Sequence, residues 1–301
     1  MDLLIEPGRA EKNYWRDLWR YRELFYFLAW RDILVRYKQT VIGIAWAVLR
    51  PFLTTIVFTV VFSRIAKLPP PEGVPYALLV MAAMLPWQFF STSMSEASNS
   101  LIGNANLISK IYFPRLVVPA GAVITSFVDF LITLGLMGLM MLWYGFLPDW
   151  RIFLLPVFML LAFGASFGIG LWLCALNVQY RDFRYIVPFI VQFGLFVSPV
   201  GFSSTRVPAI WAWHGLNLPA RLIYSLNPMA GVIDGFRWCL LRGSTGAAQA
   251  AQHGAVTAAQ RVSETGLWWP GILTAVLVTV AVSAGGIWYF RKMERTFADV
   301  I

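Results

Sequence analysis

The sequence contains few charged residues. Only 13% of its 301 residues are Asp, Glu, Lys or Arg, about half the share usual in a soluble domain. Hydrophobic residues make up 58% of the chain, so polar groups are too few to cover a water-facing surface. This composition excludes an ordinary soluble protein and indicates a chain that lies mostly within a lipid bilayer.

Other absences restrict the possible chemistry. Cys174 lies in an apolar span and Cys239 in an outer segment, so no disulfide framework is expected. His214 and His253 have no Cys, Asp or Glu at ligand spacing, so we expect no metal site. The chain has no Gly-Lys dipeptide and therefore no phosphate-binding loop. We expect no cofactor and no catalytic residue, and any energy for transport must come from another chain.

Six apolar segments have the length of a membrane-crossing helix, which needs about 20 residues. They cover approximately residues 39–63, 76–96, 115–146, 152–178, 185–203 and 267–290. The stretch before them carries acids and has no continuous apolar core, so a cleavable signal peptide is not expected. We predict an all-α polytopic membrane protein, with a cytoplasmic or interfacial region, 1–38, followed by a transmembrane domain, 39–301.

The distribution of Lys and Arg predicts the orientation. If the N-terminus is cytoplasmic, the inner loops and tails hold fifteen of these residues and the two short outer loops hold three. Because positive charge is retained on the cytoplasmic side, both termini are predicted to lie in the cytoplasm. The net charge of +9 then reflects topology and attraction to anionic membrane lipid, and nucleic-acid binding is not expected.

Aromatic and basic residues alternate before the first span, in NYWRDLWRYRELFYFLAWRDILVRYKQ. This pattern predicts an interfacial helix, with a basic anchor that only fixes topology as the alternative. Inside the first span, Arg50 precedes Pro51. A lone membrane arginine needs a partner or a water-filled cavity. Asp129 is a conceivable partner, and the alternative is that Arg50 lies near an interface or lines a conduit.

The region 206–242 contains an apolar run that is too short to cross a bilayer. Asn227–Pro228 breaks this run, because proline disfavours helix at the residue before it. Two extracytoplasmic re-entrant helices would account for both features. Asp234 and Arg237 stand at i and i+3 and can pair on the second of these helices.

A short amphipathic helix is predicted between the second and third spans, around NANLISKIYFPRLVVPAG. One stripe of this segment is formed by Leu101, Ala105, Ile108 and Tyr112. Lys110 lies off the stripe. Such a helix can dock into a groove on a soluble partner or lie passively on the bilayer, and its periodicity favours neither.

Three segments together resemble the hallmark segments of ABC-2 type permeases that export polysaccharides. They are NANLISKIYFPRLVVPAG, NVQYRDFRYIVPFIVQFGLFVSPV and LNPMAGVIDGFRWCLL. Their order and spacing agree with that family over roughly residues 13 to 297, while an Ala- and Gln-rich insertion at 244–266 departs from it.

The resemblance implies a homodimer in the bacterial inner membrane that exports a lipid-linked polysaccharide. Each copy would be capped by a cytoplasmic ATPase subunit, which holds the ATP and Mg. The alternatives are an ABC-2 permease for a drug or a teichoic-acid-like polymer, a membrane enzyme of glycan assembly, and a passive scaffold.

The resemblance also implies roles for particular residues. Segment 99–112 would be a coupling helix gripped by the ATPase, and the turn near Tyr180 would be a second contact. The implied ATPase contacts are Leu101, Ala105, Ile108, Lys110, Tyr112, Arg115, Arg181 and Asp182. The implied outer gate contains Asn227, Pro228, Asp234 and Arg237. The implied contacts of an anionic lipid headgroup are Arg16, Arg20 and Arg31.

Aromatic rings provide a possible path for a glycan, because they can weakly hold the apolar C–H faces of sugars. Phe189, Phe193 and Phe196 form one stripe of the fifth span, here called the aromatic stripe. Trp46 and Phe52 could contribute from the first span. For any single ring, lipid contact or helix packing is the simpler explanation, but we predict that the stripe lines the conduit.

Overall fold

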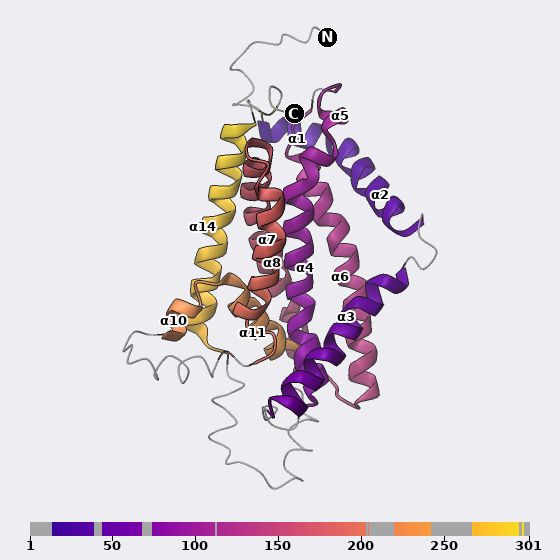
Figure 1. Cartoon of the computed structure of the whole chain (residues 1–301), viewed down its shortest axis with the longest axis vertical. Helices are drawn as coiled ribbons and strands as arrows, with labels where there is room; N and C mark the ends of the chain where they lie inside the picture. Colours follow the sequence, from indigo (N-terminus) through magenta and orange to yellow (C-terminus); the bar gives the residue numbers. More distant parts are fainter. Residues whose placement is uncertain are drawn as a thin grey trace.

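The computed structural model is a bundle of helices (Figure 1). It describes residues 14–38, 44–67, 74–111, 113–202, 204, 220–241, 267–294 and 297. This part of the chain contains no strand, which confirms the predicted all-α class. Within it, five helices are long and apolar enough to cross a membrane: Ala45–Ile65, Tyr76–Gly103, Val117–Trp143, Trp150–Gln179 and Trp269–Met293.

The helices follow the apolar segments of the sequence. Two N-terminal helices, α1 (Tyr14–Arg20) and α2 (Arg22–Lys38), precede α3 (Ile44–Thr59), which continues into the π-helical turn η2 (Val60–Ile65). The remaining elements are α4 (Tyr76–Gly103), α5 (Ala105–Ile108), α6 (Val117–Trp143), η3 (Trp150–Leu154), α7 (Leu155–Gln179), α8 (Phe183–Val197), α10 (Ala220–Tyr224), α11 (Pro228–Leu241) and α14 (Trp269–Met293). Residues 39–43, at the predicted start of the first span, lie outside the described residues.

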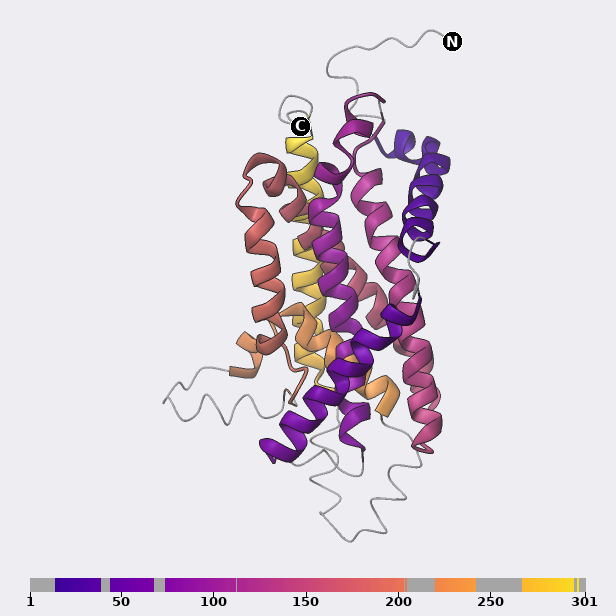
Figure 2. The ribbon, with the colours of Figure 1, turned by 45° about the vertical axis from the view of Figure 1, so that its right-hand side comes forward.

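Helix α4 forms the centre of the bundle. In its most apolar 18-residue window, 83% of the residues are buried. It packs against α6 and α7, α14 packs against α7, and α2 lies along α6. In contrast, α3 crosses obliquely over α4 and α6, and only 11% of its corresponding window is buried (Figure 2). The position of α3 therefore depends less on core packing than that of any other long helix in the described part of the chain.

The two ends of the bundle carry different elements. Helices α1, α5 and the last turn of α14 lie at one end, drawn uppermost in Figure 1 and called here the α5 end. Helices α10 and α11 lie at the other, the α11 end. Because successive long helices run in alternating directions, α4 carries the chain directly from the α11 end to α5.

Small residues allow α7 and α14 to approach closely. A Cβ atom added at Gly168 would lie 2.6 Å from the Cα of Ser283, and one at Gly286 would lie 2.3 Å from the carbonyl oxygen of Gly168. Real Cβ atoms do not make such short contacts, so both positions require glycine. Close backbone packing of this kind is a usual way to join helices in a membrane, where apolar side chains gain little from leaving lipid.

Helix α8 is shorter than the predicted span 185–203. Its 15 residues extend about 22 Å, less than the roughly 30 Å thickness of a bilayer core. Val187 is its one buried residue. The chain leaves the helix at Ser198, whose backbone is extended.

Candidate functional site

The corner at the α5 end connects α4 to α6. Leu101 is fully buried and Ile108 is 9% exposed, and both pack in an apolar cluster with Phe113 and Leu116. The opposite side of the corner is open: Asn106, Ser109, Lys110 and Ile111 are exposed. We call these four residues the exposed tip. Tyr112 lies outside the described residues.

The apolar stripe therefore does not form the outer surface of the corner. Leu101 belongs to the last turn of α4, and with Ile108 it faces the protein's own core, so neither side chain is available for docking into a partner. Ala105 is partly exposed. An amphipathic period shows that one face is covered, but it does not show whether the covering surface belongs to the same chain or to another.

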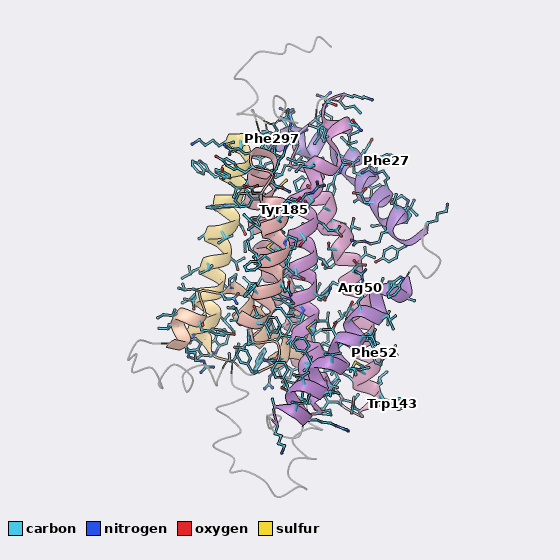
Figure 3. The ribbon with its side chains drawn as sticks, in the orientation of Figure 1. Phe27, Arg50, Phe52, Trp143, Tyr185 and Phe297 are labelled. Carbon is cyan, nitrogen blue, oxygen red and sulfur yellow. The ribbon has the colours of Figure 1, made fainter. Side chains whose placement is uncertain are left out.

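Arg115 fixes the beginning of α6 to the end of α14. Its backbone N–H donates to Oε1 of Glu294 at 2.8 Å, and its guanidinium donates to the Glu294 carbonyl and lies 5.9 Å from the ring centre of Phe297. Figure 3 shows Phe297 at this end of the bundle. Arg115 is thus largely committed to contacts within the chain, although it lies near the exposed tip.

Glu294 connects this region to α1. Burial raises the pKa of its carboxyl, while the Arg115 N–H acts in the opposite direction. The Tyr14 hydroxyl is buried beside the same carboxyl, and burial together with this negative charge raises the pKa of Tyr14. The guanidinium of Arg291 lies 4.7 Å from the centre of the Tyr14 ring. The N-terminal helix is therefore held to the end of α14.

The predicted headgroup arginines have different environments. Arg16 and Arg20 are exposed on α1, beside the exposed rings of Trp15 and Trp19. Arg31 is partly buried; its guanidinium pairs with Asp32 at 2.7 Å and donates to Oδ1 of Asn104 at 2.9 Å. Arg31 thus connects α2 to the junction of α4 and α5. No sequence pattern predicts this contact.

A second arginine of α2 reaches two membrane helices. Arg36 donates to Asp129 of α6 at 2.6 Å and to Glu96 of α4, while the hydroxyl of Tyr37 donates to the other oxygen of Asp129. We call Arg36, Tyr37, Glu96 and Asp129 the Arg36 cluster. Glu96 is the only acid in the sequence between Glu72 and Asp129, and this isolation is the one sequence signal that could have pointed to it.

In the described part of the chain Arg50 forms no ion pair with Asp129, whose carboxylate binds Arg36 and Tyr37 instead. The Arg50 side chain is exposed on α3 (Figure 3). No hydrogen bond of its guanidinium is found within the described ranges. The predicted contact with Asp129 is therefore absent among the described residues, and the alternative prediction, that Arg50 lies near an interface or lines a conduit, remains.

The turn between α7 and α8 also lies at the α5 end. Tyr180, Arg181 and Asp182 are all exposed there. Both Arg181 and Asp182 therefore remain available to a partner, unlike Leu101 and Ile108.

The aromatic stripe lies on an open face of α8. All three rings are more than half exposed, and the Phe189 and Phe193 ring centres are 4.2 Å apart. The opposite side of α8 approaches α4, where a Cβ at Gly194 would lie 2.7 Å from the Trp87 ring. The stripe is therefore an aromatic surface that the described part of the chain leaves uncovered.

The two predicted rings of α3 do not join this stripe. Phe52 lines an apolar cavity of about 450 Å³ between α3 and the ends of α4 and α6, together with Thr55, Ile56, Thr59, Val60, Ala77, Met140, Trp143 and Tyr144. Figure 3 shows Phe52 and Trp143 at that end of the bundle. Trp46 is exposed near the start of α3. Phe52 thus belongs to a separate surface.

Two helices at the α11 end flank the break at Asn227–Pro228. The Asn227 side chain caps α11 by accepting from the Met229 N–H at 3.0 Å, and it donates to Ser198 Oγ at 3.0 Å. Tyr224 of α10 donates to the Val197 carbonyl at 2.8 Å. The break therefore allows both helices to attach to the segment that follows α8.

Asp234 and Arg237 strengthen this attachment, but in a different way from the prediction. Within the described residues they form no direct ion pair. Arg237 instead donates to the Val200 and Phe202 carbonyls, each at 2.9 Å, and Asp234 accepts from Ser204. Local i, i+3 spacing permits a pair, but unpaired buried carbonyls compete for the same guanidinium.

Comparison with known proteins identifies the family. Residues 23–241 match the ABC-2 type transporter family, and this chain belongs to it. The arrangement around the exposed tip therefore lies in a membrane transport protein.

Similar proteins include three O-antigen export system permeases called RfbA. One from Myxococcus xanthus is 28% identical over 223 residues, covering 74% of this chain and 82% of the relative. Two from Klebsiella pneumoniae are 24% identical over 275 residues and 27% identical over 217 residues. The first match covers 90% of this chain and 92% of the relative. The second covers 71% of this chain and 78% of the relative.

Proposed function

We propose that this chain is the permease subunit of an ATP-binding cassette exporter. Its cargo would be a lipid-linked polysaccharide of the O-antigen type, carried from the cytoplasm across the bacterial inner membrane. Similarity to O-antigen export permeases, which extends over 90% of the chain for one relative, supports this cargo. Two copies of the chain form the membrane part, and each binds one ATPase subunit carrying ATP and Mg²⁺.

One observation supports this proposal above the others: the exposed tip projects from the end of the most buried helix. Helix α4 is 28 residues long and continuous up to Gly103, only two residues before α5. A soluble ATPase that grips Lys110 and Ile111 would therefore act on a helix packed at the centre of the bundle. Arg181 and Asp182 offer the same ATPase a second contact.

In this proposal the α5 end is cytoplasmic. The concentration of Lys and Arg on that side supports the orientation. Helix α8, with the residues that follow it, makes the sixth crossing, while α10 and α11 form a re-entrant outer gate. Their attachment to the end of α8 supports a common role at the outer mouth.

The uncovered aromatic stripe gives the polymer a surface along which to slide. It has no charge to bind one sugar tightly, so its contacts suit a moving chain. Trp46, exposed on α3, offers a separate ring to the polymer. Arg16 and Arg20, beside exposed tryptophans, meet the anionic headgroup where the cargo enters at the cytoplasmic face.

The test is a deletion of the gene, complemented either by the natural chain or by a chain with Lys110→Glu and Ile111→Asp. The matched control carries Lys67→Glu, which changes an exposed lysine at the opposite end of the bundle. Surface and intracellular glycan are then measured separately. We expect the deletion and the tip variant to retain full-length polymer inside the cell, while the natural chain and the control restore it outside.

Other results identify the alternatives. Loss of polymer from both compartments would point to a membrane enzyme of glycan assembly. Unchanged surface glycan in the deletion strain would mean that the cargo is a different polymer or a drug.

A further inference from the structure

Helix α2 is attached to the bundle at two levels of α4. Arg31 binds Asn104, the residue between α4 and α5, and Arg36 binds Glu96. These two acceptors are eight residues apart, about 12 Å along a helix. Because both contacts are directed from α2 to α4, the two helices are connected as a unit rather than at a single point.

The lower attachment includes a third helix. The guanidinium of Arg36 bridges carboxylates on α4 and α6, and Tyr37 adds a hydrogen bond to the α6 carboxylate. The three charged side chains are between 26% and 34% exposed, so water weakens these ion pairs less than it would on an open surface. A planar guanidinium holds two carboxylates in fixed directions through its rigid set of donors, whereas the three donors of a lysine ammonium rotate and fix the directions less well.

Helix α3 packs on α4 and α6, but little of it is buried. It follows α2 after a short connection, and only 11% of its most apolar window is buried. Helix α4, in contrast, is buried along most of its length and ends beside α5. A movement of α5 can therefore reach α3 through α4, the Arg36 cluster and α2, in addition to the direct packing of α3 on α4.

We propose that Arg36 is a positioning residue that makes α2 move together with α4, so that a displacement of α5 is passed to α3. This inference rests on the proposed function, in which an ATPase moves α5. The cluster acts as a permanent link and stays closed throughout the transport cycle. Arg36 touches neither cargo nor nucleotide, and its effect is to determine whether α3 follows the ATPase.

The test measures movement of α3 directly. Spin labels are placed on Leu53→Cys of α3 and Leu277→Cys of α14, both of which are exposed. Helix α14 contributes no residue to the Arg36 cluster and therefore serves as the reference. The native cysteines, Cys174 and Cys239, are buried and therefore poorly accessible to the label. In the complete complex with its ATPase, the distance between the labels is measured with and without ATP, alongside ATP hydrolysis.

We expect ATP to change this distance in the natural chain and in a Lys38→Gln control, whose exposed base lies on the same last turn of α2. Arg36→Gln should lose the distance change while the complex still assembles and hydrolyses ATP. Arg36→Lys should lose most of it, because the rotatable donors of an ammonium hold the two acids less rigidly than the guanidinium does. An unchanged response in Arg36→Gln would overturn the proposal.

A second variant keeps the test informative if Arg36→Gln does not fold. Arg36→Cys with Glu96→Cys can be joined by a short bifunctional thiol reagent, which replaces the ion pair with a covalent link. In this variant the spin labels are attached to keto-bearing unnatural amino acids at the two label positions, so that only the linked pair carries exposed thiols. We expect the linked protein to recover the ATP-dependent distance change, and failure to recover it would count against the proposal.

The measurement also separates this inference from the proposed cargo. If ATP moves the labels only when the link is intact but no polysaccharide is exported by the natural complex, the Arg36 link stands and the cargo is wrong. If polysaccharide is exported equally well by Arg36→Gln, with normal movement of α3, the cargo stands and the link is wrong.

Discussion

Two isoleucines three residues apart offer a sharp test of which face of the α5 corner meets the ATPase. Ile108 is 9% exposed and packs in the apolar cluster, whereas Ile111 is 50% exposed. The same substitution, isoleucine to alanine, removes the same atoms from the core in one case and from the exposed tip in the other. Each variant is therefore the control for the other.

The two substitutions are expected to differ clearly in their effects on folding stability and on ATPase binding. Ile108→Ala removes buried apolar atoms and leaves a cavity, which costs about 2–5 kcal/mol of folding stability. Ile111→Ala should change stability by less than about 0.5 kcal/mol, as for most surface substitutions. If Ile111 fills a pocket on the ATPase, its removal should weaken ATPase binding roughly tenfold, equivalent to about 1.4 kcal/mol.

The assay pairs thermal unfolding of each purified chain with titration of its ATPase subunit. We expect Ile108→Ala to melt earlier but to bind the ATPase normally at low temperature, and Ile111→Ala to melt normally but to bind weakly. Normal ATPase binding by Ile111→Ala would refute the assignment of the exposed tip to the interface. Normal melting of Ile108→Ala would refute the inward orientation of the stripe.

Three further predictions concern other parts of the chain. Changing the aromatic stripe to alanine at all three positions should slow polymer export without loss of ATPase binding, and unchanged flux would rule out a conduit role. Gly168→Ala should lower the melting temperature more than Gly164→Ala, because its Cβ would meet the Ser283 backbone at 2.6 Å rather than a Thr279 methyl at 3.0 Å. Glu294 binds its proton more tightly in the folded chain, so stability should fall as pH rises from the ordinary carboxyl pKa to its raised value. Glu294→Gln should flatten that decline in melting temperature, and an unaltered pH profile would contradict the buried carboxyl.

The sequence was sufficient for features that depend on local composition. Long apolar runs predicted helices because a bilayer forces backbone groups to pair within each segment. The proline at position 228 likewise predicted a break, and the structure separates α10 from α11 there.

Features that depend on which residues meet in the tertiary structure could not be predicted in the same way. Both Arg36 and Arg50 could reach Asp129 in a plausible helix arrangement, and no local sequence pattern shows which of them binds it. Arg237 had a carboxylate one turn away but binds carbonyls that follow α8, because that segment is left without helical partners. In each case the sequence identified the charged group, and three-dimensional packing selected its partner.

The partners of the charged groups also bear on how cargo can be held. Glu96 and Asp129 both bind Arg36, Glu294 binds Arg115, and Asp234 is held by Ser204. These acids stabilise helix positions and are not arranged along one open surface. The uncovered face of α8 carries aromatic rings, and α3, elsewhere on the bundle, carries the exposed Arg50. An arginine at such a position requires water, an anion or the membrane surface beside it, so the exposed Arg50 fits the interface or conduit position that the sequence predicted for it.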